Sequence, residues 1–224
     1  MNTSLSTLRE TEVRIPCGNI ELEGDLVVPA GADGIVVFVH GSGSSRRSPR
    51  NRGVAAEMHR HRLATLLFDL LTPAEAAAEA DTGKLRFDIP LLTDRLVEVT
   101  RWLRREEVAD GMRVGYFGSS TGAAAALAAA ARVPRVKAVV SRGGRTDLAG
   151  PDVGSVRAAT LMIAGGLDQA VLEWNQQTFE KLTGVTQLSV ISGAGHLFEE
   201  PGALEKVAEL AASWFGIHLA RPEG

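Results

Sequence analysis

Cysteine is almost absent from this 224-residue sequence, since Cys17 is the only one. A single cysteine excludes an internal disulfide framework and any metal site built from several cysteines. Long apolar runs are lacking too, because no stretch approaches the roughly 18 consecutive apolar residues that indicate a membrane-spanning helix. We therefore expect no metal site and no membrane partner.

An excess of charge of one sign is also lacking. The chain has 24 Lys and Arg residues against 27 Asp and Glu, a formal net charge of −3, which gives no electrostatic reason to expect nucleic acid as a partner. The first twelve residues are polar and contain no apolar stretch of the kind found in secretory signals. We expect residues 1–12 to form a flexible N-terminal tail and the protein to be cytoplasmic.

Hydrophobic residues, in contrast, make up 45% of the chain and charged residues 23%, which is typical of a globular protein. A chain of this length can bury a sizeable core without disulfides or metals. No internal repeat or low-complexity linker divides it. We therefore expect a single α/β domain over residues 1–224.

The apolar residues follow two periodicities. Residues 13–28 alternate apolar and polar side chains around Gly18-Asn19, which predicts an antiparallel hairpin. Beyond the hairpin, short apolar runs alternate with runs of helical length, and this order predicts a mostly parallel sheet with helices on both faces, a three-layer α/β/α sandwich. The predicted strands after the hairpin are 34–39, 64–69, 113–117, 136–140, 160–164 and 186–191, and the predicted helices are 51–61, 91–105, 123–131, 170–182 and 201–214.

Residues 70–88 are the only insertion of appreciable length in this pattern. They are long enough for a small lid but too short for a cap domain. Pro73, preceded by Thr72, predicts a short helix here, because proline is favoured in the first turn of a helix.

The most informative stretch is Gly118-Ser119-Ser120-Thr121-Gly122, which lies between a predicted strand and a predicted helix. A strand, a sharp turn with a serine at its tip and then a helix is the arrangement in which G-x-S-x-G forms a nucleophile elbow. The pentapeptide alone is weak evidence, because glycine and serine also occupy ordinary turns. Ser120 is a candidate nucleophile only if the chain supplies its partners.

Asp168 and His196 are the partners that such a serine requires. A serine hydroxyl is a weak nucleophile without an adjacent base, and histidine titrates in the right range to act as one. A carboxylate then holds the imidazole in the correct tautomer. Both residues follow predicted strands, and the chain order Ser, Asp, His is the one expected for this scaffold. Because the carboxyl ends of parallel strands share one edge of a sheet, we expect Ser120, Asp168 and His196 to form a catalytic triad.

Other interpretations exist for each partner. Asp168 is placed to cap the helix that follows it, and Asp147, after the preceding strand, is a second candidate for the acid. His196 is placed to hydrogen-bond within its own loop. We expect His40, at the end of strand 34–39, to pack or hydrogen-bond locally rather than to serve as the base.

Acyl transfer also needs hydrogen-bond donors for the developing oxyanion. The backbone N–H of Thr121 is one candidate, because it follows the nucleophile at a helix N-terminus. The loop after strand 34–39 is expected to supply the second donor. We predict the N–H of Ser42, with that of Gly43 as the alternative.

An arginine cluster follows the same loop and comprises Arg46, Arg47, Arg50 and Arg52. Positive charge at a predicted helix N-terminus opposes the helix dipole, so the cluster needs compensation. A carboxylate or phosphate on the substrate would provide it, which makes Arg46 a candidate substrate-binding residue. Arg142, at the end of a neighbouring strand, is a second candidate. The alternative is a solvated charged loop.

On these residues the chain resembles the α/β-hydrolase superfamily, and within it the small dienelactone-hydrolase-like branch. The resemblance covers about residues 13–215. Residues 68–72 and 141–145 look like a subgroup of hydrolases that is sometimes fused to a phosphoribosyltransferase-like domain. The motifs that carry the resemblance are His40-Gly41-Ser42-Gly43, Gly118 to Gly122, Gly165-Gly166-Leu167-Asp168 and Gly193-Ala194-Gly195-His196.

This resemblance implies an α/β-hydrolase fold without a cap domain and without a cofactor, in which Ser120 is the nucleophile, His196 the base and Asp168 the acid that orients it. Dienelactone hydrolases proper use a cysteine nucleophile, so the serine here favours a small carboxylic ester, thioester or lactone as the substrate. Acyl transfer to an alcohol or amine would use the same intermediate. A non-catalytic ligand-binding protein is the alternative outside the enzymes.

Overall fold

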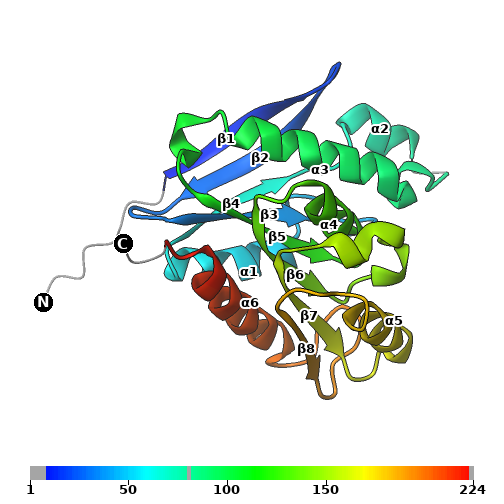
Figure 1. The fold of residues 1–224 in the computed structure, drawn as a ribbon. Helices are drawn as coiled ribbons and strands as arrows, with labels where there is room; N and C mark the ends of the chain where they lie inside the picture. Colours follow the sequence, from blue (N-terminus) through cyan, green and yellow to red (C-terminus); the bar gives the residue numbers. More distant parts are fainter. Residues whose placement is uncertain (1–8, 80–81, 222–224) are drawn as a thin grey trace, which may run out of the picture.

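An eight-stranded sheet forms the centre of the computed structural model, which describes residues 9–79 and 82–221 (Figure 1). The strand order is β1-β2-β4-β3-β5-β6-β7-β8. The β1/β2 and β2/β4 pairs are antiparallel and the other neighbours are parallel. The strands are β1 Arg9–Cys17, β2 Ile20–Val28, β3 Gly34–Val39, β4 Leu63–Phe68, β5 Arg113–Ser119, β6 Val136–Arg142, β7 Ala159–Gly165 and β8 Thr186–Ile191.

Helices cover both faces of this sheet (Figure 1). α1 (Pro49–Arg60) and α6 (Ala203–Leu219) pack on one face, and α3 (Ile89–Leu103), α4 (Thr121–Arg132) and α5 (Gln169–Phe179) pack on the other. Two groups of buried apolar side chains fill the spaces between these layers. The predicted three-layer α/β/α sandwich is therefore confirmed. No helix in the described part of the chain has both the length and the apolar character needed to cross a membrane.

The N-terminal hairpin forms as predicted but begins earlier. β1 and β2 pair in register from Arg9 opposite Val28 to Cys17 opposite Ile20. The backbone of residues 9–12 is therefore part of the sheet, which corrects the expectation that the tail extends to residue 12. Residues 1–8 of the expected tail lie outside the described residues.

The central strands owe their position to continuous apolar sequence. All six residues of β3 and all six of β4 are buried, as expected of parallel strands covered on both faces.

In the 70–88 insertion, α2 (Pro73–Ala78) forms the predicted short helix. Thr72 and Glu75 make reciprocal side-chain to backbone hydrogen bonds at its start, a capping box that satisfies two otherwise free N–H groups.

A close backbone contact lies where α4 crosses the end of β3. A Cβ atom at Gly122 would lie 2.1 Å from the carbonyl oxygen of Val39, and a Cβ atom at Gly118 would lie 2.5 Å from Cα of Ala123. The first turns of α4 are rich in alanine, and Ala123 to Ala126 are fully buried. Only residues with minimal side chains permit this approach, so both glycines of the pentapeptide are required by packing.

Gly122→Ala is expected to destabilise the protein by about 3 kcal/mol or more, since the added methyl group overlaps backbone that cannot rotate away. The measurement is the free energy of unfolding from urea titrations.

Gly53→Ala is the matched control. Gly53 lies inside α1, and a Cβ atom there would meet nothing within 4 Å. Alanine is favoured over glycine in a helix, so this variant is expected to gain about 0.5–1 kcal/mol. Equal effects of the two substitutions would contradict the packing argument.

Candidate active site

Ser120, His196 and Asp168 form one hydrogen-bonded chain at the carboxyl edge of the sheet. His196 Nε2 lies 3.2 Å from Ser120 Oγ, and His196 Nδ1 lies 2.6 Å from Asp168 Oδ2. A carboxylate only accepts hydrogen bonds, so the contact with Asp168 places the ring proton on Nδ1 and leaves Nε2 free to accept a proton. The side chain of His196 is 40% exposed, so the site is open to solvent.

Asp168 and Asp147, the two candidate acids, have different partners. Asp168 follows β7 and makes no side-chain cap on α5, so the capping interpretation does not apply. Asp147 forms a two-point ion pair with Arg145, at 2.9 and 2.8 Å. The geometry therefore favours Asp168 as the acid that faces His196.

Backbone hydrogen bonds fix the acid and histidine loops relative to each other. The N–H of Leu167 donates to the carbonyl of Ala194 over 2.9 Å, and the N–H of Gly166 donates to Ile191 over 2.9 Å. The N–H of Gly195 donates to the Glu200 carboxylate, also over 2.9 Å. Both loops thus meet as one unit, which holds His196 near Asp168.

Ser120 has a strained backbone, with φ 51° and ψ −121°. L-residues other than glycine rarely adopt a positive φ, and such strain is typical of functional sites. The strain is held by hydrogen bonds on both sides. Ser120 N–H donates to the carbonyl of Arg142 over 3.1 Å, and the Ser120 carbonyl accepts from the N–H groups of Ala123 and Arg145. This turn lifts the serine side chain out of the sheet edge towards His196.

The structure places both predicted oxyanion donors beside the nucleophile. Thr121 N–H begins α4 and has no acceptor within the helix. Ser42 N–H points at the same turn, where it donates to the Thr121 hydroxyl over 2.9 Å. Gly41 lies against the turn, since a Cβ atom at that position would lie 3.1 Å from Ser120 Cβ.

His40 fixes the start of this loop. Its Nε2 accepts a hydrogen bond from the N–H of Leu70 over 3.0 Å, and its Nδ1 lies 2.9 Å from the carbonyl of Gly41. Because Nε2 accepts, Nδ1 carries the proton and donates to Gly41. Burial lowers the pKa of His40, which favours this neutral form. His40 thus bonds locally, as expected, and makes no contact with Ser120.

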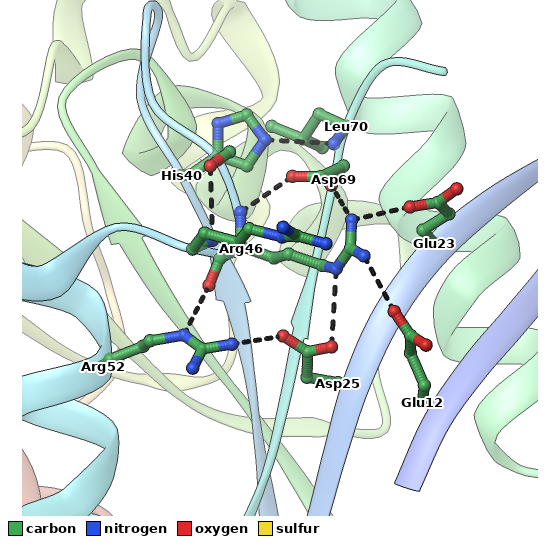
Figure 2. Close-up of polar contacts among 10 residues, drawn as sticks. Glu12, Glu23, Asp25, His40, Arg46, Arg52, Asp69 and Leu70 are labelled. Carbon is green, nitrogen blue, oxygen red and sulfur yellow. Dashed lines mark hydrogen bonds and ion pairs between the residues drawn. The ribbon is translucent and has the colours of Figure 1, made fainter. Parts of the chain in front are cut away.

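Arg46 has a different role from the predicted one. It is 4% exposed and lies at the centre of an ion-pair cluster that joins the loop to the hairpin and to the end of β4 (Figure 2). Burial alone would lower the pKa of Arg46. Hydrogen bonds and charge from Asp69 and the other acids outweigh this effect, so the pKa is raised overall. The carboxylates that face its guanidinium are Glu12, Glu23, Asp25 and Asp69.

This cluster corrects the expectation that Arg46 binds a substrate anion. Its charge is already compensated by four carboxylates, so the guanidinium is not available to a ligand. The compensation that the arginine-rich loop requires comes from the hairpin instead. Sequence reasoning missed these partners. The available signal was the alternation of Glu23 and Asp25 with apolar residues along β2, which places both side chains on one face of the strand.

Arg142 does not reach the cavity next to the loop. It pairs in register with Ser119, and neighbouring residues in register point to the same face of a sheet. Ser119 Oγ donates to Asn51 of α1 over 3.3 Å, so Arg142 also lies on the α1/α6 face. It is 7% exposed and its guanidinium carbon lies 5.9 Å from the ring centre of Phe198. This placement argues against the predicted contact with substrate.

A cavity of about 460 Å³ lies beside the loop and adjoins the nucleophile through Gly41. Residues 40–47 form one wall, and the segment after β4 forms the other. Its volume falls within the range of small-molecule sites. The predicted lid therefore forms a wall of the cavity. The apolar side chains that line it are Leu70, Leu71, Pro73, Ala76 and Leu92, and the charged ones include Glu23, Arg47 and Arg86.

Comparisons with protein families and solved structures agree with the resemblance seen in the sequence motifs. The model described as the dienelactone hydrolase family matches residues 65–215. The crystal structure of a dienelactone hydrolase from Anabaena variabilis ATCC 29413 is 51% identical and has a TM-score of 0.94, covering 95% of this chain and 99% of that one. Est1E from Butyrivibrio proteoclasticus is 15% identical with a TM-score of 0.78, covering 94% and 99% of the two chains, and shares the fold.

A curated relative from Mycobacterium tuberculosis (strain H37Rv) is 55% identical over 217 residues, and its name assigns it provisionally to the phosphoribosyl transferases. The match covers 96% of this chain but 48% of the relative. The chain thus spans about half the length of this relative.

Glu79 holds the lid-like segment together. It is 3% exposed and accepts hydrogen bonds from the N–H groups of Leu85 and Arg86, over 2.6 and 3.2 Å, and from the hydroxyl of Thr82 over 3.0 Å. Burial alone would raise the pKa of Glu79, but these hydrogen bonds lower it from 4.5 to about 2. Sequence reasoning did not identify this residue.

Glu79→Gln is therefore expected to lower the free energy of unfolding near neutral pH, with a smaller difference in acid. A carboxylate with a depressed pKa contributes stability above its ordinary value of 4.5 and loses it as the pH falls towards 2. Urea titrations of the wild type and the variant near pH 7 and pH 3.5 measure this. An exposed control, Glu107→Gln, should change stability little at either pH. A Glu79→Gln difference that does not shrink in acid would contradict the assignment.

Proposed function

This chain belongs to the dienelactone hydrolase family and is a hydrolase, and we propose that it cleaves small carboxylic esters through an acyl-enzyme on Ser120. His196 is the general base and Asp168 orients it. The observation that carries the proposal is the hydrogen-bonded chain from Asp168 through His196 to Ser120, with distances of 2.6 and 3.2 Å.

In the first step Ser120 Oγ attacks the ester carbonyl and His196 Nε2 takes the hydroxyl proton. The 3.2 Å separation is compatible with this role, since catalytic hydrogen bonds commonly shorten when substrate binds. Asp168 stabilises the imidazolium that forms. His196 then gives the proton to the leaving alcohol, and a water activated by the same histidine releases the acid.

Thr121 N–H and Ser42 N–H are the proposed oxyanion donors. The hydroxyl of Thr121 accepts the Ser42 hydrogen bond over 2.9 Å, so Ser42 already points at the nucleophile turn. A negatively charged oxygen is a better acceptor than a hydroxyl and would take over this bond as charge develops. A donor of this kind typically contributes about 10²–10³ in rate.

The arrangement also orients the two halves of the ester. The leaving oxygen must lie near His196 to receive its proton, and the carbonyl oxygen must face Ser42 and Thr121. The acyl group then extends towards the remaining side, where Gly41 adjoins the cavity of about 460 Å³. This volume favours short acyl groups over long lipid chains.

The transferase name belongs to the mycobacterial relative. The match covers 48% of that protein, and the three residues assembled here are a nucleophile, a base and its orienting acid. They suit acyl chemistry on a serine.

Ser120→Ala is expected to lower kcat for p-nitrophenyl acetate and butyrate by about 10⁴-fold or more, because the nucleophile is lost. The measurement is steady-state hydrolysis, with folding of the variant checked by circular dichroism. Unchanged turnover in the variant would refute the proposal.

Asp168→Asn and Asp147→Asn form a matched pair for the acid. The first is expected to reduce kcat by about 10³–10⁴-fold, since the histidine loses its orienting carboxylate. The second changes an acid of the same type that pairs with Arg145 instead, and kcat is expected to stay within about threefold of wild type. A larger loss of kcat in Asp147→Asn than in Asp168→Asn would assign the role of the acid to Asp147.

A further inference from the structure

Arg142 carries a buried positive charge with no visible compensation. The residue is 7% exposed, and its Nε and Nη1 atoms find no hydrogen-bond partner within the described residues. Arg46 is similarly buried but faces four carboxylates. A buried guanidinium normally needs such partners, because its donors and its charge both lose water on burial. The donors of Arg142 therefore call for an acceptor.

Arg142 has no ion-pair partner among the described residues. No carboxylate of residues 9–79 or 82–221 lies within ion-pair distance of it. Glu200, in the neighbouring loop, uses Oε1 to accept the N–H of Gly195, and its buried Oε2 has no partner among the described residues and forms no ion pair with Arg142. Burial, together with the nearby charge of Arg50, lowers the pKa of Arg142 to about 10. Arg142 thus remains a cation at neutral pH despite its environment.

Arg50 adds a second set of donors. It lies in the first turn of α1, and its Nη1 pairs with the exposed Glu199 over 2.7 Å. Its Nε is buried and, like those of Arg142, lacks a partner in the described part of the chain. Two arginines therefore present three buried N–H-bearing atoms without an acceptor. A neutral water would satisfy some of these donors but would leave the charge of Arg142 uncompensated.

We propose that a small monovalent inorganic anion, of the size of chloride, binds between Arg142 and Arg50 beneath the loop that carries His196. Such an anion accepts several N–H groups at once and neutralises the uncompensated charge. Its small size follows from the burial of Arg142. The site is separate from the cavity proposed for the acyl group and does not rest on the proposed function.

The position of this site links it to the catalytic histidine loop. The Arg142 guanidinium lies over Phe198, which is 1% exposed and has a positive φ of 55°. Phe198 follows His196 by two residues. The adjoining Gly143 also contacts this loop, since a Cβ atom there would lie 3.2 Å from the His196 carbonyl oxygen. A bound anion would hold Arg142 in place under Phe198 and thereby stabilise the loop.

The first test is thermal stability as a function of anion. Sodium bromide replaces sodium methanesulfonate at constant ionic strength, so that a small spherical anion replaces a bulky one of the same charge. Wild type is expected to gain roughly 3–6 °C in Tm for each tenfold rise in bromide above its Kd, as for any ligand that binds only the folded state. A Tm that is independent of the anion would overturn the proposal.

Arg142→Met separates anion binding from simple packing. Methionine keeps an apolar chain over Phe198 but removes the charge, so the variant is expected to be at least as stable as wild type in methanesulfonate and to lose the bromide response. Arg50→Met should raise the bromide concentration that is needed for the Tm response by about tenfold or more. Arg47→Met, an exposed control in the loop before α1, should keep it. Equal destabilisation by Arg142→Met in both salts would show a packing role and contradict the proposal.

Crystallography with bromide provides the second test and does not depend on the stability of any variant. An anomalous peak is expected within hydrogen-bond reach of Arg142 Nε or Nη1 and of Arg50. Density for a water that bromide does not replace would overturn the proposal. A bromide peak without a Tm response in solution would mean an adventitious ion only and would also count against it.

Discussion

The contact between Gly122 and the carbonyl of Val39 sets the geometry of the candidate site. It brings the first turn of α4 against the end of β3, so that the strained turn at Ser120 and the loop that begins at His40 lie side by side. Ser42 N–H reaches Thr121 over 2.9 Å as a result. Because the neighbouring strands are parallel, Asp168 and His196 arrive at the same edge. The geometry of the candidate site thus depends on a backbone approach that only glycine allows.

Charge is distributed unequally around this edge. The buried Arg46 is matched by four carboxylates from the hairpin and β4, which anchor the loop that carries Ser42. Arg142, at the carboxyl end of β6, has no such match among the described residues. Removing one partner of a buried ion pair destabilises a protein more than replacing both partners by apolar residues, because the remaining charge stays buried without compensation. Arg46 therefore serves as an anchor, and Arg142 has the donors of an anion site.

Much of the fold and site was predictable from the sequence, for physical reasons. Strand runs such as residues 34–39 are apolar throughout, and the triad residues follow strand ends in a fixed chain order, so both could be recognised from local pattern. The partners of Arg46 could not, because ion pairs across the sheet depend on strand register and on side chains far apart in the chain. The same holds for the burial of Arg142 and for the hydrogen bonds of Glu79. The start of β1 at Arg9 was missed because polar residues in an edge strand resemble a tail.

The most direct test of the account is a search for the acyl-enzyme. The protein is mixed with p-nitrophenyl acetate, quenched in acid during turnover and analysed by mass spectrometry, first intact and then after digestion. One acetyl group per chain is expected, located on Ser120. Turnover of the ester without a covalent adduct, or an adduct on another residue such as Cys17, would contradict it.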